Sequence, residues 1–115
     1  SNPGQPLGYV FEDGSIVSHP PSGAPALAML ASLGACIAMS LEWCAKQGRV
    51  DLRPLTVEVK GLKATDKPSR FERIEIALME EPNGAGALTA DLLDQAKQIC
   101  TVSNSLSCEL SFSIA

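Results

Sequence analysis

Two cysteines stand where a thiol could do chemistry. Cys36 lies inside an uncharged run rich in alanine and leucine, and Cys100 closes a second stretch with helical periodicity. A cysteine that loses its proton is a nucleophile and a redox group. Because each of these two thiols has a distinctive place on a predicted helix, we interpret Cys36 and Cys100 as a redox pair. The simpler alternative for each is a small apolar residue of the core.

The remaining cysteines and the single histidine have other interpretations. Cys44 follows Cys36 by eight residues, about 12 Å along a helix. This separation is too large for a disulfide between them, so we expect Cys44 to pack in the core. Cys108 shares a predicted strand face with apolar residues and is also expected in the core. His19 lies in a proline-rich loop. It is either a solvated loop residue or a base or cation that activates Cys36.

A long apolar helix must carry Cys36. The sequence predicts it from Ala24 to about Lys46, with Gly48 as the C-terminal stop. It is apolar around nearly its whole circumference, so it must be buried on all sides or lie in a membrane. Serine and glycine interrupt it and predicted strands flank it, which argues against a membrane span. Since a small domain can hardly surround such a helix, we expect a homodimer that encloses two copies between sheets.

The other elements follow from turn residues and alternation. Asp13-Gly14 between short apolar runs predicts an N-terminal hairpin. Apolar and polar residues alternate over 55–60 and 70–79, which predicts two half-buried strands, expected as an antiparallel pair joined by a polar loop from Gly61 to Ser69. Thr89 is the expected N-cap of a helix that reaches Ile99, and residues 108–114 form a last strand. This order of elements predicts an α+β fold.

Length and charge narrow the class of protein. A chain of 115 residues is expected to be a single domain over 1–115, and its net charge of −4 argues against nonspecific binding of nucleic acid. The four cysteines are too few for a disulfide scaffold and lack the spacing of a zinc site, so no metal or other cofactor is expected. No signal peptide is predicted, and we expect a cytoplasmic protein. Ser1-Asn2 is interpreted as a tag remnant.

The sequence resembles the family of osmotically inducible protein C and the organic hydroperoxide resistance proteins (OsmC/Ohr). The resemblance rests on Leu33-Gly34-Ala35-Cys36 in an apolar helix with Pro25 near its start, and on Phe71-Glu72-Arg73-Ile74 in a strand. It rests also on Cys100-Thr101-Val102-Ser103 with Leu106 after the second helix. It covers about residues 22–115, and the order of elements agrees.

The resemblance implies a fold and an activity. The fold would be an intertwined homodimer, with antiparallel sheets wrapped around a long buried central helix from each chain. The activity would be that of a thiol peroxidase acting on organic hydroperoxides. The resemblance implies that Cys36 attacks the peroxide and becomes a sulfenic acid, and that Cys100 then forms a disulfide with it. An external dithiol would reduce this disulfide.

The chain departs from the family at residues that assist the attacking thiol. The family uses an arginine from its N-terminal sheet and a glutamate near the start of the first helix. Ala26 and Leu27 stand at the expected glutamate positions here, and no arginine precedes Arg49. Thr101 stands where the family commonly has proline.

These departures leave the function open between alternatives. One is the thiol peroxidase, with Cys36 activated by His19 or by an arginine such as Arg70 or Arg73 from either subunit. A second is a non-enzymatic dimer of the same fold that binds a small apolar ligand in an interface pocket, which the loss of charged residues would make more apolar. A third is a thiol-based redox sensor.

Overall fold

The computed structural model describes three parts of the chain: residues 9–10, 16–17 and 25–115. The predicted N-terminal hairpin is confirmed in its strands. Strand β1 (Tyr9–Val10) pairs antiparallel with β2 (Ile16–Val17), and Tyr9 lies opposite Val17. The predicted turn at Asp13-Gly14 and the candidate base His19 lie outside the described residues.

The long helix α1 (Pro25–Gln47) confirms the sequence prediction almost to the residue. Proline suits the first helical position because its fixed φ matches the helix and its missing N–H has no partner there. At the other end, the N–H of Gly48 donates to the carbonyl of Cys44 at 3.0 Å and closes the last turn. The mean hydropathy of α1 over an 18-residue window is 1.6, so this helix is long and apolar enough for a membrane span. The core helix of a soluble protein meets the same criterion.

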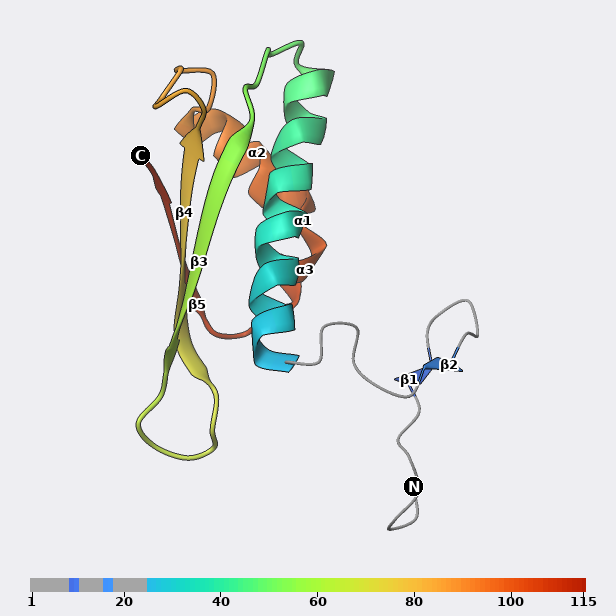
Figure 1. Cartoon of the computed structure of the whole chain (residues 1–115), viewed down its shortest axis with the longest axis vertical. Helices are drawn as coiled ribbons and strands as arrows, with labels where there is room; N and C mark the ends of the chain where they lie inside the picture. Colours follow the sequence, from blue (N-terminus) through green and yellow to red (C-terminus); the bar gives the residue numbers. More distant parts are fainter. Residues whose placement is uncertain (1–8, 11–15, 18–24) are drawn as a thin grey trace.

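The sheet has three strands in the order β3-β4-β5, drawn side by side in Figure 1. β3 (Leu55–Lys63) and β4 (Phe71–Glu80) form the predicted antiparallel pair. β5 (Glu109–Ile114) runs parallel to β4, so the sheet is mixed and the expectation of antiparallel sheets was wrong for this pair. The physical reason is the connection: the helices between β4 and β5 form a crossover, which is what a parallel pair requires.

β3 is longer than the alternation indicated. The sequence predicted a loop from Gly61, but the strand continues through it to Lys63. The ring of Phe71 on β4 covers this glycine, and a Cβ at Gly61 would lie 2.5 Å from its Cε1 atom. A glycine inside a strand often marks such a close approach. Gly61 therefore lies inside β3 and does not end the strand.

Two helices follow β4. In α2 (Ala90–Ile99) the hydroxyl of Thr89 accepts a hydrogen bond from the N–H of Leu92 at 3.2 Å, which confirms the predicted N-cap. The short helix α3 (Thr101–Ser105) was not predicted. Between them Cys100 is extended, with φ −76° and ψ 97°, and serves as the C-cap of α2 and the N-cap of α3. The chain thus breaks its helix at the second candidate cysteine.

One face of α1 is buried and the opposite face is exposed. α1 runs alongside β3, and α2 packs against it (Figure 1). The fully buried side chains of the core come from α1, β4 and the α2–α3 junction: Leu33, Ile37, Leu41, Ile74, Ile76, Leu78, Glu80 and Cys100. Met39, on the far side of α1, and Leu27, near its start, are each 67% exposed. The expected burial of this helix on all sides is therefore not met by residues 25–115 of one chain, because the sheet and α2 cover only part of its circumference.

The buried carboxylate of Glu80 fixes the loop that leads into α2. Glu80, at the end of β4, is 1% exposed, and its two oxygens accept from the N–H of Arg53 at 3.0 Å and from the N–H of Leu88 at 2.6 Å. Burial alone raises the pKa of Glu80, but these two N–H groups and those of Ala87 and Gly86 outweigh it and hold the pKa below its ordinary value. Glu80 thereby ties the start of β3 and the loop before α2 to the sheet.

Candidate functional site

The two candidate cysteines lie together. Cys36 is partly buried on α1, and Cys100 is fully buried at the α2–α3 junction. The side chain of Cys100 contributes to the lowered pKa of the Cys36 thiol, and both cysteines are free thiols. Residues far apart in the sequence are therefore brought near each other where α3 packs against α1. This arrangement suits the formation of a disulfide between them.

The surroundings of Cys36 favour its thiolate. Its pKa lies below the ordinary value, chiefly because the backbone N–H of Val102 donates to the sulfur. Burial opposes this effect and raises the pKa, while the Cys100 thiol, the N–H of Thr101 and the Ser40 hydroxyl lower it further. Thr101 and Val102 open α3, where backbone N–H groups have no partner within the helix. These two N–H groups are therefore available as hydrogen-bond donors to the Cys36 sulfur on α1.

Sequence reasoning missed this group of donors. The absence of an arginine before Arg49 and of a glutamate at Ala26 or Leu27 pointed to an unassisted thiol. The available signal was Thr101: proline has no N–H, whereas threonine has one. Residues identified only by the structure are thus Val102 and Ser40, both of which lower the pKa of the Cys36 thiol.

The candidate arginines are engaged elsewhere in the chain. Arg70 forms an ion pair with Asp66 at 3.0 Å, and Arg73 forms one with Glu75 at 3.5 Å. Neither contributes to the pKa shift of Cys36. The groups that lower this pKa within residues 25–115 are neutral hydrogen-bond donors, which take the place that a cation would have.

An apolar cavity opens beside Cys36. Its volume is about 420 Å³, within the range of small-molecule sites. α1 contributes most of its wall, and α2 contributes one residue. The lining residues are Ser32, Ala35, Cys36, Met39, Ser40, Trp43 and Ile99. Because no charged side chain lines it, the cavity suits an apolar group brought next to the Cys36 sulfur.

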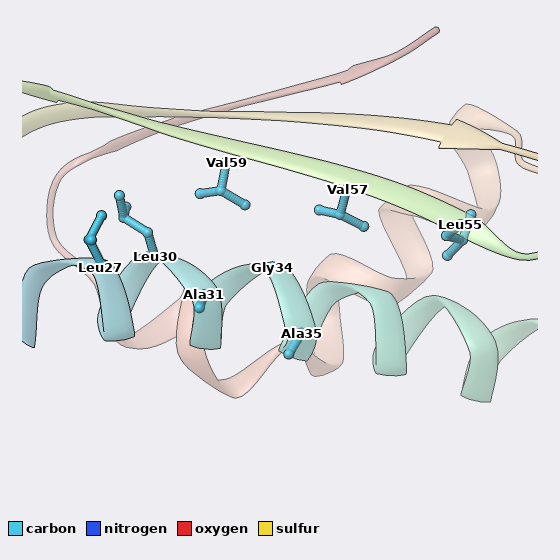
Figure 2. Close-up of a pocket in the computed structure, with 8 residues that line it drawn as sticks. All are labelled: Leu27, Leu30, Ala31, Gly34, Ala35, Leu55, Val57 and Val59. Atoms are coloured by element: carbon cyan, nitrogen blue, oxygen red, sulfur yellow. The ribbon is translucent and has the colours of Figure 1, made fainter. Parts of the chain in front are cut away.

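A second cavity, of about 450 Å³, lies between α1 and β3 and is shown in Figure 2. The residues that line it are glycine and residues with apolar side chains: Leu27, Leu30, Ala31, Gly34, Ala35, Leu55, Val57 and Val59. Gly34 lets the strand approach the helix, since a Cβ there would lie 3.0 Å from Cγ2 of Val59. Figure 2 shows Val57 and Val59 pointing from the strand toward the helix. This cavity carries no polar group that could do chemistry.

The other singled-out residues have structural places. Cys44 is 6% exposed in the core, and Cys108 packs against the core from its edge, as expected for both. Trp43 is 55% exposed beside the Cys36 cavity. In the part of the chain that the structure describes, no group of three or more His, Cys, Asp or Glu residues is arranged to hold a metal ion.

Solved structures share this fold at low sequence identity. An organic hydroperoxide resistance protein OsmC from Legionella pneumophila is 14% identical, with a TM-score of 0.65 over 100% of this chain and 99% of that one. The organic hydroperoxide resistance protein OhrB of Bacillus subtilis is 14% identical, with a TM-score of 0.63 over 96% of each chain. A hypothetical protein from Aquifex aeolicus is 20% identical, with a TM-score of 0.67 over 96% of this chain and 93% of that one. At these identities the likeness establishes the fold alone.

Sequence comparison supplies the family. Comparison with curated proteins finds no match. The sequence profile of the family described as OsmC-like protein matches residues 20–115, which include α1, the sheet and both candidate cysteines. This match spans far more than half of the chain and agrees with the resemblance read from the cysteine motifs. The protein therefore belongs to the OsmC-like family.

Proposed function

We propose that this protein is a thiol-dependent peroxidase that reduces organic hydroperoxides through Cys36 and Cys100. The observation that carries the proposal is the Cys36 sulfur itself, which meets the Cys100 thiol and two backbone N–H groups beside an apolar cavity. Its lowered pKa gives a larger fraction of thiolate at a given pH than an ordinary cysteine has. The apolar wall of the cavity suits the organic group of a hydroperoxide better than it suits hydrogen peroxide.

The reaction uses two thiols in sequence. The Cys36 thiolate attacks the terminal oxygen of the hydroperoxide, so that an S–O bond forms and the O–O bond breaks. The alkoxide that leaves takes a proton and becomes an alcohol, and Cys36 becomes a sulfenic acid. The Cys100 sulfur then attacks the Cys36 sulfur, which forms a disulfide and releases water. An external dithiol reduces this disulfide and is itself oxidised to a disulfide, a cycle that fits the reducing cytoplasm.

The proposal predicts which disulfide a hydroperoxide makes. Reduced protein treated with one equivalent of cumene hydroperoxide should form a disulfide between Cys36 and Cys100, found by peptide mass mapping. Cys44 and Cys108 serve as internal controls and should stay free, since Cys44 is buried away from the cavity. Formation of cumyl alcohol should match the disulfide formed. If Cys36 and Cys100 stay reduced, or if the four cysteines oxidise without preference, the proposal is wrong.

A second candidate function is the binding of a small apolar ligand without chemistry. The cavity between α1 and β3, of about 450 Å³ and lined by apolar side chains, favours it. It predicts a ligand that copurifies with the protein and is detected by native mass spectrometry. It also predicts that the peroxide treatment leaves Cys36 reduced, so the same experiment separates the two functions.

We also propose that the chain works as a homodimer built on the exposed face of α1. A residue every four positions forms a ridge along the exposed side of α1, and its first three members also line the cavity beside β3: Leu27, Ala31, Ala35, Met39 and Trp43. Three of these side chains are large and apolar, and each is more than half exposed. A row of this spacing is a ridge of the kind that packs into the groove of another helix, and its alanines allow a close approach. A second copy of α1 would bury the ridge and wall the Cys36 cavity.

Placing a charge in the middle of this ridge should separate the subunits. Ala35 is exposed in the single chain, so Ala35→Glu costs little in a monomer but buries a charge in the proposed dimer. The expected result is a shift from dimer to monomer in sedimentation velocity. Thr65→Glu adds the same charge on the exposed loop between β3 and β4 and should leave the dimer intact. A wild-type protein that sediments as a monomer would contradict the proposed dimer.

A further inference from the structure

Ser40 has an unusual position in α1. It lies one turn after Cys36 and is 7% exposed, although serine usually lies at the surface. Its hydroxyl donates to the backbone carbonyl of Cys36 at 2.8 Å. Ser40 and Cys36 also line the same cavity. A buried hydroxyl is therefore bonded to the residue that the proposed reaction uses, and Ser40 lines the cavity in which the peroxide would lie.

The backbone hydrogen bonds of α1 are complete without the bond from the Ser40 hydroxyl to the Cys36 carbonyl. In a helix the carbonyl of Cys36 already accepts the backbone N–H of Ser40, four residues later. The hydroxyl is thus a second donor to an oxygen that is already satisfied. A serine hydroxyl has one hydrogen and rotates to suit its acceptors. Because this hydroxyl lies 2.8 Å from the carbonyl oxygen of Cys36 and both residues line one cavity, the Cys36 sulfur is a second acceptor close to it.

We propose that Ser40 is a positioning residue whose hydroxyl hydrogen turns from the Cys36 carbonyl to the Cys36 sulfur when the thiol loses its proton. The proposal rests on the proposed role of Cys36 as the attacking thiol. The backbone N–H groups of Thr101 and Val102 have fixed directions, whereas the Ser40 hydroxyl can follow the charge. Hydrogen bonds to an ionised group are roughly twice as strong as bonds between neutral groups. The thiolate therefore competes successfully for the hydrogen, and the carbonyl keeps its helical bond.

Few groups contribute to the lowered pKa of the Cys36 thiol. The direction of its pKa shift agrees with the proposal, since the Ser40 hydroxyl contributes to the lowering. From α3 and its junction, the Cys36 sulfur is faced by two backbone N–H groups and by the thiol of Cys100. Cys100 is the titratable group in contact with it, and the other contributing groups are uncharged. Within α1, Ser40 is the contributing donor.

The test compares two replacements at position 40. Ser40→Ala removes the hydroxyl and keeps the helix, because alanine is the best helix former. Ser40→Thr keeps a hydroxyl that can bond the same carbonyl one turn before it. The probe is iodoacetamide, and mass mapping follows the alkylation of the Cys36 peptide as a function of pH. A thermal unfolding curve for each variant reports whether the fold is kept.

The expected result is a shift of the Cys36 alkylation profile to higher pH in Ser40→Ala. At neutral pH its alkylation rate should fall by roughly threefold to tenfold, the effect of one hydrogen bond. Ser40→Thr should return the profile toward that of the wild type. An Ala variant that is folded and has the wild-type profile would overturn the inference. A purely structural role for the hydroxyl would lower the unfolding temperature without moving the alkylation profile.

The same proteins separate this inference from the proposed function. Turnover of cumene hydroperoxide with dithiothreitol is measured on the wild type and on both variants. If the wild type consumes no peroxide while the alkylation profile still moves in Ser40→Ala, the proposed function fails and the role of Ser40 stands. If the peroxide is consumed and the profile does not move, the role of Ser40 fails and the function stands.

Discussion

Thr101→Pro should slow the reaction of Cys36 with iodoacetamide and with cumene hydroperoxide roughly tenfold at neutral pH, the scale of one hydrogen bond to a charged group. The replacement removes one of the groups that lower the pKa of the Cys36 thiol, the backbone N–H of Thr101, because proline has no backbone donor. The pKa of the Cys36 thiol should therefore rise. Its pH profile moves to higher pH, and less thiolate is present at pH 7. The N–H of Val102 remains, so reactivity falls without vanishing.

The fold should accept this proline. Thr101 is exposed at the first position of α3, where proline is favoured. Cys100 before it is already extended, with φ −76° and ψ 97°, the region that a residue before proline prefers. A change in reactivity can therefore be assigned to the lost donor and not to unfolding.

Matched variants complete this experiment. Thr101→Ala removes the same side chain but keeps the N–H, so it should react like the wild type. Cys36→Ser supplies the background rate of both assays. Stopped-flow rates over a range of pH give the titration of the thiol directly. Equal profiles for the proline and alanine variants would show that the N–H of residue 101 does not stabilise the thiolate.

Glu80→Ala should lower the free energy of unfolding by on the order of 3 kcal/mol, the scale for leaving buried donors without their charged acceptor. Glu80 is 1% exposed and its oxygens accept from the N–H groups of Arg53 and Leu88. Alanine would leave both donors unpaired and would release the loop before α2. Glu80→Gln keeps the shape and one acceptor oxygen, so a smaller loss is expected. Urea unfolding followed by circular dichroism measures both.

The pH dependence of stability gives a second readout at Glu80. Its pKa in the folded state lies below the ordinary value, so its stabilising effect is present above the pKa of the unfolded chain. That effect is lost as pH falls from about 5 through the folded pKa. Glu80→Gln should flatten this loss. Glu81→Gln is the control, because Glu81 is exposed and accepts only from the Thr56 hydroxyl at 2.7 Å. Equal acid sensitivity of the wild type and Glu80→Gln would contradict the assignment.

Periodicity and capping in the sequence predicted most elements of the fold. The apolar run after Pro25 predicted α1, the alternation of apolar residues predicted β3 and β4, and Thr89 predicted the start of α2. These signals are local, since each depends on residues within one or two turns or along one strand. The direction of β5 is not local. It depends on where the crossover through α2 and α3 returns the chain, and for that reason the sheet was expected to be antiparallel and is mixed.

The sequence by itself determined the α+β order, the family and the two thiols that belong together in the proposed chemistry. Only the tertiary structure decided how Cys36 is assisted. The helix break at Cys100 turns the N–H groups of Thr101 and Val102 toward a sulfur on α1, more than sixty residues earlier in the chain. Such a contact has no local pattern, because it depends on how α3 packs against α1. The missing charged residues were visible in the sequence, and the neutral donors in their place became visible only in the fold.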